Sequence, residues 1–167
     1  MRRKDKEVTD IDDKIIFIGK CKVCRIGLSE NNMPYIVPVN FGYDYEDNTL
    51  TLYFHSAKEG RKTDIIKNNN NACFEVDCDH RLIKGETACD CSYAYKSVIG
   101  FGKIIFLEDT NEKTDALNKI LMHQTDKENI HTFPPDKLKN MTIYKLVVDE
   151  FTGKRKDFLD EIYNVHT

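Results

Sequence analysis

The sequence predicts a mainly β protein in which six strands, mostly antiparallel, form a closed or partly open barrel. Three observations predict this class. Segments with alternating apolar and polar residues recur along the chain, short turn sequences join most of them, and the strand–helix alternation of parallel sheets is missing. Closure into a barrel is favoured because it removes exposed strand edges. Two to four helices are expected at the periphery.

Length and charge limit the classes of protein that the chain can represent. The chain has 167 residues, of which 40% are hydrophobic and 32% are charged. A chain of this size and composition is expected to form one domain with one core, at residues 1–156, followed by a tail at 157–167. The net charge of -3 with interspersed signs gives no basic face for nucleic acid. The charged N-terminus precedes no apolar stretch long enough for a signal peptide or membrane span. We therefore expect a cytoplasmic protein whose six cysteines are free thiols.

The first elements follow from capping residues and alternation. Thr9 is expected to cap a short helix that Gly19 ends, and a strand is expected over residues 21–29. An asparagine-rich turn leads to a second strand over residues 34–43. Its two prolines each remove an amide donor, so we expect this strand not to be paired normally along its whole length.

The central part of the chain contains the clearest strand. Asp47-Asn48 is expected to form the hairpin turn into a strand over residues 49–55. A short helix over residues 63–67, ended by a run of asparagines, should follow. Two further strands are expected, over residues 72–79 and 95–107. The second contains Gly100 and Gly102, where a bulge or the close approach of a ligand would be easiest.

The last elements are a helix, a strand and a charged tail. Thr110 is expected to cap a helix over residues 112–123, which precedes a loop with two prolines. The last strand is expected over residues 142–150. The apolar residues between Phe158 and Tyr163 predict a marginal helix in the tail.

The residues from His55 to Lys62 are the most informative for function. A hydroxyl, three cations and a glycine lie together at an expected helix start, in the order His55, Ser56, Ala57, Lys58, Glu59, Gly60, Arg61 and Lys62. Backbone amides, the helix dipole and positive charge then coincide, as binding of a phosphate monoester requires. The alternative interpretation is a solvated, lysine-rich helix start.

A second segment lies upstream, at Val37-Pro38-Val39-Asn40. Its proline-interrupted backbone stands next to an amide side chain, so free carbonyls and amides could meet the polar edge of a planar ring. The alternative is an ordinary edge strand. Together, the two segments suggest a ligand with a ring at one end and a phosphate at the other.

Five segments, taken in order, resemble the split-barrel flavoproteins related to pyridoxamine 5′-phosphate oxidase. The resemblance is greatest to the branch that includes 5-nitroimidazole-resistance proteins, and it spans about Met1 to Lys156. The segments that carry it are Cys24 to Leu28, Pro34 to Tyr43, Leu52 to Lys62, Ser97 to Gly102 and Phe151 to Arg155.

This resemblance implies a six-stranded antiparallel split β-barrel (Greek key) and a homodimer with flavin at the subunit interface, normally FMN and sometimes FAD. By position, it assigns the phosphate to Ser56, Lys58, Arg61 and Lys62, with Ala57 and Gly60 in the same turn. It assigns the isoalloxazine ring to Val37, Pro38, Val39 and Asn40, and a contribution from the adjoining strand to Ser97, Val98, Ile99 and Gly100.

The implied activity is that of a flavin-dependent oxidoreductase acting on small oxidised compounds such as nitroaromatics, with His55 as the catalytic residue. A neutral imidazole at the strand end could hydrogen-bond substrate or donate a proton. The chain has no tryptophan, and the C-terminal segment typical of the true oxidases is not visible, which argues against vitamin B6 oxidation. A flavin-binding or redox-sensing module without turnover is the alternative.

The cysteines allow a different class of protein. Cys78, His80, Cys89 and Cys91 could close a structural zinc site if their two segments met, although we expect no metal. Cys21 and Cys24 have redox-motif spacing, but residues three apart on a strand point to opposite faces. Heme degradation occurs among relatives of this fold, and no constellation of axial ligands favours it here.

Overall fold

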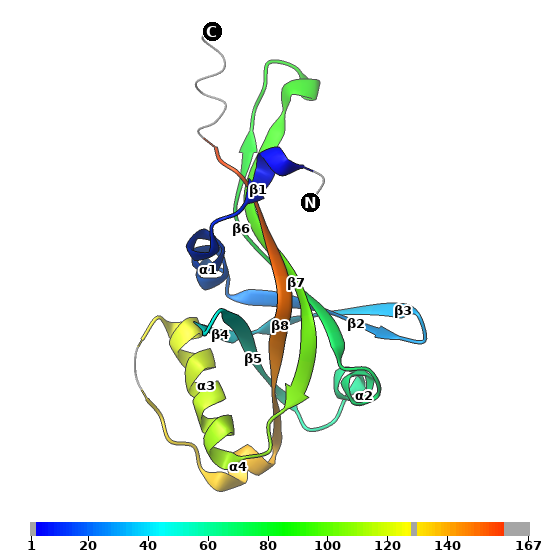
Figure 1. Cartoon of the computed structure of the whole chain (residues 1–167), viewed down its shortest axis with the longest axis vertical. Coiled ribbons are helices and arrows are strands. Elements are labelled where there is room, and N and C mark those ends of the chain that lie inside the picture. Colours follow the sequence, from blue (N-terminus) through cyan, green and yellow to red (C-terminus); the bar gives the residue numbers. More distant parts are fainter. Residues whose placement is uncertain (1–2, 128–129, 159–167) are drawn as a thin grey trace. The chain divides into compact units, whose positions relative to one another are not determined.

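The structure is a computed structural model that describes residues 3–127 and 130–158. Eight β-strands form in this part of the chain (Figure 1). They are β1 (Glu7–Val8), β2 (Val23–Glu30), β3 (Met33–Asn40), β4 (Gly42–Glu46), β5 (Thr49–Ala57), β6 (Asn71–Ile83), β7 (Ser92–Phe106) and β8 (Met141–Lys156). The helices are α1 (Ile11–Lys20), α2 (Arg61–Asn68), α3 (Thr110–Thr125) and α4 (Pro135–Lys139), with 3-10 turns at Lys4–Lys6 and Ala88–Asp90.

One sheet contains all of these strands, in the order β3-β2-β6-β7-β8-β5-β4, with β1 on β8. The predicted class, mainly β and antiparallel, is confirmed. The expected number of six strands is too low. The predicted strand 34–43 is two strands, because the chain changes partner at the buried Phe41: β3 pairs with β2, and β4 pairs with β5. The other addition, β1, has only two residues and leaves no visible alternation.

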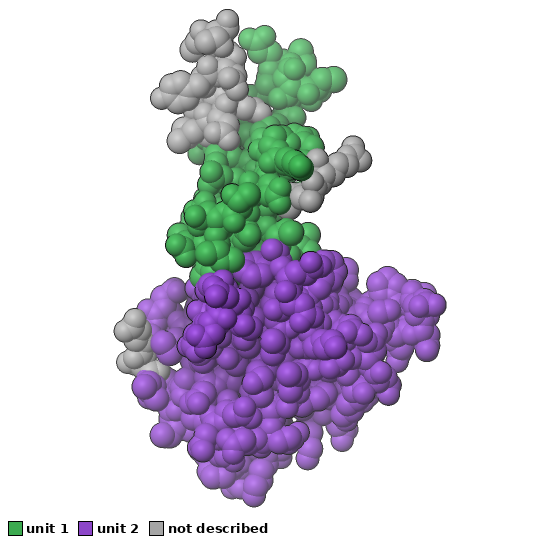
Figure 2. Space-filling model, viewed as in Figure 1, with its two compact units in different colours: residues 1–21, 76–99, 152–167 green, residues 22–75, 100–151 purple. Residues whose placement is uncertain are grey.

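The described chain forms two compact units (Figure 2). Of the described residues, one unit comprises 3–21, 76–99 and 152–158, and the other comprises 22–75, 100–127 and 130–151. Among the described residues, no helix is long and apolar enough to cross a membrane.

The larger unit has its core along β5 and β8. Leu50, Leu52 and Phe54 alternate with more exposed residues on β5 and are almost fully buried, as the period-2 pattern predicted. The helix α3 adds a second cluster, which consists of Leu107, Ala116, Leu117, Ile120, Leu138 and Ile143. This helix packs so closely on β4 that a Cβ atom at Gly42 would overlap the backbone of Lys119 and Ile120.

The smaller unit is built around α1 and the ends of three long strands. Asp10 caps α1 by accepting hydrogen bonds from the amides of Asp12 and Asp13, at 2.8 and 3.1 Å. The expectation that Thr9 caps this helix is wrong by one residue, and the helix continues through Gly19 to Lys20. One glycine costs a helix only about 1 kcal/mol, which tertiary packing readily offsets.

The second half of the chain departs from the expected boundaries in a similar way. The cap of α3 is Asp109 rather than Thr110, since its carboxylate accepts from the amides of Asn111 and Glu112. The strand β8 continues to Lys156, six residues past the expected end at Glu150. The loop with two prolines contains the short helix α4. The predicted tail helix reaches beyond residue 158 and so lies outside the described residues.

The two hairpin turns have the backbone conformation that their asparagine and aspartate residues predicted. Asp47 and Asn48 have φ of 49° and 61°, and Asn31 and Asn32 have φ of 50° and 64°. Two consecutive positive values are the hairpin geometry that asparagine and aspartate tolerate. The expectation that the prolines prevent normal pairing along this strand is wrong for β3, which pairs with β2 through all eight of its residues. As the last strand of the sheet, β3 can direct both missing amides away from β2.

The two glycines of β7 accommodate neighbouring protein atoms. A Cβ atom at Gly100 would lie 2.7 Å from the carbonyl oxygen of Glu150, and one at Gly102 would overlap the carbonyl oxygen of Val147. The requirement for glycine at both positions therefore comes from close packing against β8.

We predict that Gly102→Ala lowers the free energy of unfolding by about 1–3 kcal/mol, because the added methyl group forces β7 and β8 apart. Gly27→Ala is the matched control, since its Cβ atom would lie 3.6 Å from that of Cys73, an ordinary contact. Urea unfolding of both variants measures the difference, and equal stabilities would contradict the packing argument.

Candidate functional site

The site is built where β5 ends and α2 begins. Gly60 precedes α2 with φ of 146° and ψ of 159°, a backbone conformation that residues with a side chain rarely adopt. Among the residues that the structure describes, no side chain caps this helix. The first amide groups of a helix have no partner within it, so the start of α2 presents hydrogen-bond donors and the positive end of the helix dipole.

Lys62 adds a partly desolvated cation at the same place. Its ammonium nitrogen lies 5.6 Å from the centroid of the Tyr144 ring, and burial lowers the pKa of Lys62 below its usual value. Tyr144 is fully buried and stacks on Phe54 at 5.3 Å between ring centroids. A cation that has lost hydration is stabilised by a nearby anion, so this lysine favours a negatively charged ligand.

Arg61 connects the start of α2 to the β2–β3 hairpin. Its guanidinium lies 3.7 Å from the carboxylate of Glu30 and 4.6 Å from the centroid of the Tyr35 ring. Tyr35 shares the half-buried face of β3 with Val37 and Val39, whereas Pro38 is exposed on the opposite face. Arg61 therefore links the start of α2 to the hairpin on which Val37 to Asn40 lie, through Glu30 and Tyr35.

Asn40 has internal hydrogen-bond partners. Its amide donates to the carbonyl oxygen of Lys22 at 3.0 Å and to the side chain of Gln124 at 3.1 Å. Gln124 in turn donates to the carbonyl oxygens of Lys22 and Phe41. This network ties the end of β3 to the end of α3, so a ligand ring would have to share the amide of Asn40 with it.

His55 lies near the end of β5, opposite Ile143 of β8. Partial loss of hydration, and then the positive charge of Lys62, lower the pKa of its imidazole below the ordinary value of 6.5. The neutral ring therefore predominates at pH 7. Among the described residues, none hydrogen-bonds this imidazole, so both ring nitrogens can serve a ligand.

The remaining residues of the turn interact mainly with backbone. The Ser56 hydroxyl donates to the carbonyl oxygen of Ala57 at 3.0 Å, and the Thr142 hydroxyl donates to that of Lys58 at 3.4 Å. The side chain of Lys58 is exposed. The hydroxyl of Ser56 thus has a partner that an incoming phosphate would compete with.

The predicted contribution from β7 divides between the two units. In the smaller unit, Ser97 and Ile99 line a cavity of about 170 Å³ with Thr152 and Lys154, while Val98 is buried. Gly100 belongs to the larger unit, where it packs against β8.

The four residues of the possible zinc site do not come together. Within residues 3–127 and 130–158, no group of three or more histidine, cysteine, aspartate or glutamate side chains is placed to hold a metal ion. All six cysteines are free thiols. Cys21 lies just after α1 rather than on a strand, so the strand geometry expected for the Cys21 and Cys24 pair does not apply.

Two residues of the site, Tyr35 and Tyr144, were not predicted from the sequence. Tyr35 could have been found, because residues 35, 37 and 39 share a strand face by the period of two. Tyr144 could not, since its position under Lys62 depends on the pairing of β5 with β8, which joins segments about ninety residues apart.

Comparison with known families decides the relationship. The family model described as pyridoxamine 5′-phosphate oxidase matches residues 12–155. The chain belongs to this family. A search among curated proteins finds no match.

Several solved structures are similar to this member of the family. A candidate 5-nitroimidazole antibiotic resistance protein from Bacteroides thetaiotaomicron is 32% identical, with a TM-score of 0.77 over 89% of this chain and 86% of that one. A flavocytochrome from Azotobacter vinelandii is 16% identical, with a TM-score of 0.75 over 99% of this chain and 78% of the flavocytochrome chain. An FAD- and heme-binding protein from Mycobacterium smegmatis is 15% identical, with a TM-score of 0.79 over 97% of this chain and 80% of the Mycobacterium chain. The last two show a shared fold.

We predict that His55 titrates below pH 6.5 and that Lys62→Gln raises its pKa, because the substitution removes a positive charge that disfavours the imidazolium. NMR titration of the histidine ring protons measures both values. Lys67→Gln, which removes an exposed charge in the last turn of the same helix, should leave the pKa of His55 unchanged. An unchanged value in Lys62→Gln would contradict the electrostatic argument.

Proposed function

We propose that this protein binds a flavin, FMN or alternatively FAD, and uses it as an oxidoreductase on small oxidised compounds. The observation that carries the proposal is the start of α2. Its amides lack a side-chain cap, Gly60 supplies the required backbone, and Lys62 supplies a partly desolvated cation. A flavin phosphate is the kind of anion that such a helix start binds.

The residues present fit the two ends of a flavin. Ser56, Lys58, Arg61 and Lys62 provide a hydroxyl and three cations for the phosphate, and Ala57 and Gly60 provide backbone. The strand from Val37 to Asn40 provides backbone for the isoalloxazine ring, on the hairpin that Arg61 contacts through Tyr35 and Glu30. Ser97, Val98, Ile99 and Gly100 are proposed as a further contribution from β7.

Similar proteins support the choice of cofactor. The Mycobacterium smegmatis protein binds FAD and heme by its description, and a Mesorhizobium loti protein of the same fold, 18% identical with a TM-score of 0.61, is described as FAD-binding. The Bacteroides protein, described in terms of 5-nitroimidazole resistance, supports nitroaromatic compounds as the substrate class.

The chain and the cofactor divide the chemistry between them. A bound flavin supplies transfer of hydride or electrons to the acceptor. The protein orients the cofactor through the start of α2. His55, neutral at pH 7, donates a hydrogen bond through its ring N–H to the substrate at the end of β5. We place this activity in the cytoplasm.

One observation favours a second candidate, a flavin-binding or redox-sensing module without turnover. Catalytic acids and bases are commonly oriented by a third group, and among the described residues none hydrogen-bonds His55. Steady-state reduction of a 5-nitroimidazole with NAD(P)H or dithionite as the electron source separates the candidates. Turnover that falls in His55→Gln supports the enzyme, whereas flavin binding with negligible turnover supports the module.

We predict that the purified protein is yellow or takes up FMN, and that Lys62→Gln weakens FMN binding by about tenfold to a hundredfold, through the loss of a charge-assisted contact. Riboflavin, which lacks the phosphate, should bind the wild type and this variant equally. Fluorescence quenching of each flavin measures the affinities, with Lys67→Gln as the matched variant.

Two results would count against flavin binding at α2. A protein that takes up neither FMN nor FAD would refute the cofactor. An equal loss of FMN and riboflavin affinity in Lys62→Gln would refute the placement of the phosphate.

We also propose that a second copy of the chain covers the outer face of β7. Phe101 and Ile105 are 51% and 45% exposed on the same side of this strand, with Lys103 between them. Two large apolar side chains four residues apart on one face of a long strand are typical of a covered face. The homodimer that the sequence resemblance implies is the occupant that fits.

We predict that Phe101→Asp shifts a dimer to a monomer, because a carboxylate would be buried in the contact. Ile130→Asp, at an isoleucine that is 86% exposed outside β7, is the control and should leave the assembly unchanged. Sedimentation velocity measures the mass. A wild-type monomer, or a dimer that persists in Phe101→Asp, would contradict the proposed contact.

A further inference from the structure

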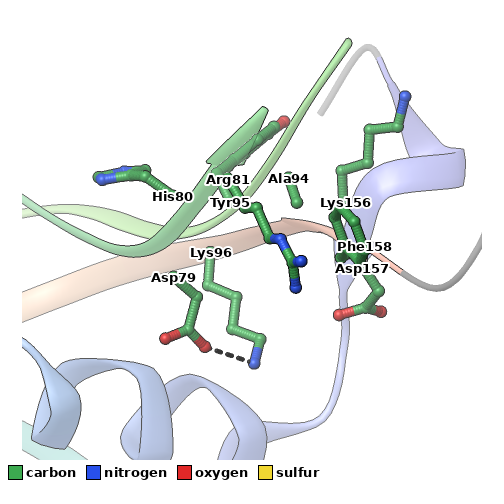
Figure 3. Close-up of a pocket in the computed structure, with 9 residues that line it drawn as sticks. All are labelled: Asp79, His80, Arg81, Ala94, Tyr95, Lys96, Lys156, Asp157 and Phe158. Atoms are coloured by element: carbon green, nitrogen blue, oxygen red, sulfur yellow. Dashed lines mark hydrogen bonds and ion pairs between the residues drawn. The ribbon is translucent and has the colours of Figure 1, made fainter. Parts of the chain in front are cut away.

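A second candidate binding site lies in the smaller unit, apart from α2. A cavity of about 340 Å³ opens where the outer parts of β6 and β7 meet the end of β8 (Figure 3). All of its lining residues belong to this unit: Asp79, His80, Arg81, Ala94, Tyr95, Lys96, Lys156, Asp157 and Phe158. Its volume lies at the lower end of the range for small-molecule sites, about 300–1,000 Å³.

Arg81 is the central group of this cavity. Its guanidinium carbon lies 3.6 Å from the centroid of the Phe158 ring. Within the part of the chain that the structure describes, no carboxylate or carbonyl group forms a hydrogen bond or ion pair with this guanidinium. The stacking fixes the plane of the group, so its N–H donors remain available to a ligand.

Lys96 supplies a second cation to the same space. Its ammonium group lies 2.7 Å from the Asp79 carboxylate, which also pairs with Lys20 at 3.1 Å. One carboxylate is thus shared between two lysines, and this group of three retains a positive charge. Figure 3 shows the side chains of Arg81 and Lys96 directed to the same side, whereas His80 points away.

The other charges around the cavity have partners of their own. Lys156 contacts the hydroxyl of Ser92. Asp157 lies 3.4 Å from Arg155, which also approaches Asp13 at 3.3 Å. The carboxylate of Asp157 is therefore partly neutralised, and the electrostatic balance near Arg81 favours an anion.

We propose that this cavity binds a small organic anion through its carboxylate or phosphate group. Arg81 pairs with two oxygens of that group in the bidentate manner of guanidinium, and Lys96 supplies the second charge. A bare ion would leave most of the volume empty. The rest of the ligand packs against Ala94 and the edge of Phe158.

Isothermal titration calorimetry tests the proposal on the full-length protein loaded with one equivalent of FMN and freed of unbound flavin, so that the start of α2 is occupied and no free FMN competes for the cavity. The probes are AMP and benzoate, as an organic phosphate and an organic carboxylate, with adenosine as the neutral match for AMP. AMP or benzoate should bind the wild type, and adenosine should bind at least tenfold more weakly than AMP. Inorganic phosphate should bind more weakly than an organic anion of the preferred class.

Variants assign the binding to the cavity. Arg81→Gln should weaken binding of the preferred anion at least tenfold, and Arg81→Lys, which lacks the planar fork, should also weaken it. Lys84→Gln removes an exposed charge just after β6, outside the cavity lining, and should have no effect. Circular dichroism checks that each variant folds.

The same measurements can overturn the proposal. Failure of the wild type to bind AMP or benzoate at millimolar concentration would do so, as would unchanged affinity in Arg81→Gln. Loss of binding in Lys62→Gln but not in Arg81→Gln would place the anion at α2 instead. The result is independent of flavin binding, because assignment to the cavity depends on Arg81 alone.

Discussion

The antiparallel ladder between β5 and β8 determines where the proposed flavin site can form. Seven residue pairs, from Thr51 with Val147 to Ala57 with Met141, hold β5 in register, and its inward side chains pack in the core of the larger unit. A shift by one residue would expose this apolar face, so the register is strongly specified. Because α2 begins four residues after β5 ends, the same ladder positions the helix start and His55.

Desolvation contributes to the chemistry at that position. Lys62 lies above the ring of the buried Tyr144 and has lost hydration, which lowers its pKa. Its charge, together with the partial burial of His55, keeps the imidazole neutral at pH 7. Lys62 therefore favours an anionic ligand and, after the desolvation of the ring itself, contributes to the lowered pKa of His55.

The family relationship limits what the fold can say about the reaction. Structures with similar folds and 15 to 18% identity include a flavocytochrome and proteins described as binding FAD, one of them together with heme. Since one fold supports several functions, the residues of the site, and not the fold, indicate the function. Here, the uncapped start of α2 supports a phosphate-bearing cofactor, and Arg81 supports a second anion in a different unit.

The sequence by itself determined the mainly β, antiparallel class, the alternation of β5 and the Asp47-Asn48 hairpin. It also predicted the helix after β5, although α2 begins at Arg61, two residues before the expected start at Thr63. These features depend on local backbone geometry, namely the period of two along a strand and the dihedral angles that asparagine and glycine tolerate. Capping residues were wrong by one position, because neighbouring polar residues compete for the same amides. The number of strands was too low because a change of partner at Phe41 leaves no mark on the alternation.

Only the tertiary structure decided which distant residues meet. Arg61 contacts Tyr35, the amide of Asn40 binds Lys22 and Gln124, and Arg81 stacks on Phe158. Each of these contacts depends on the register between segments far apart in the chain. Pairing and core packing set that register, and the residues in contact carry no local pattern that reveals it.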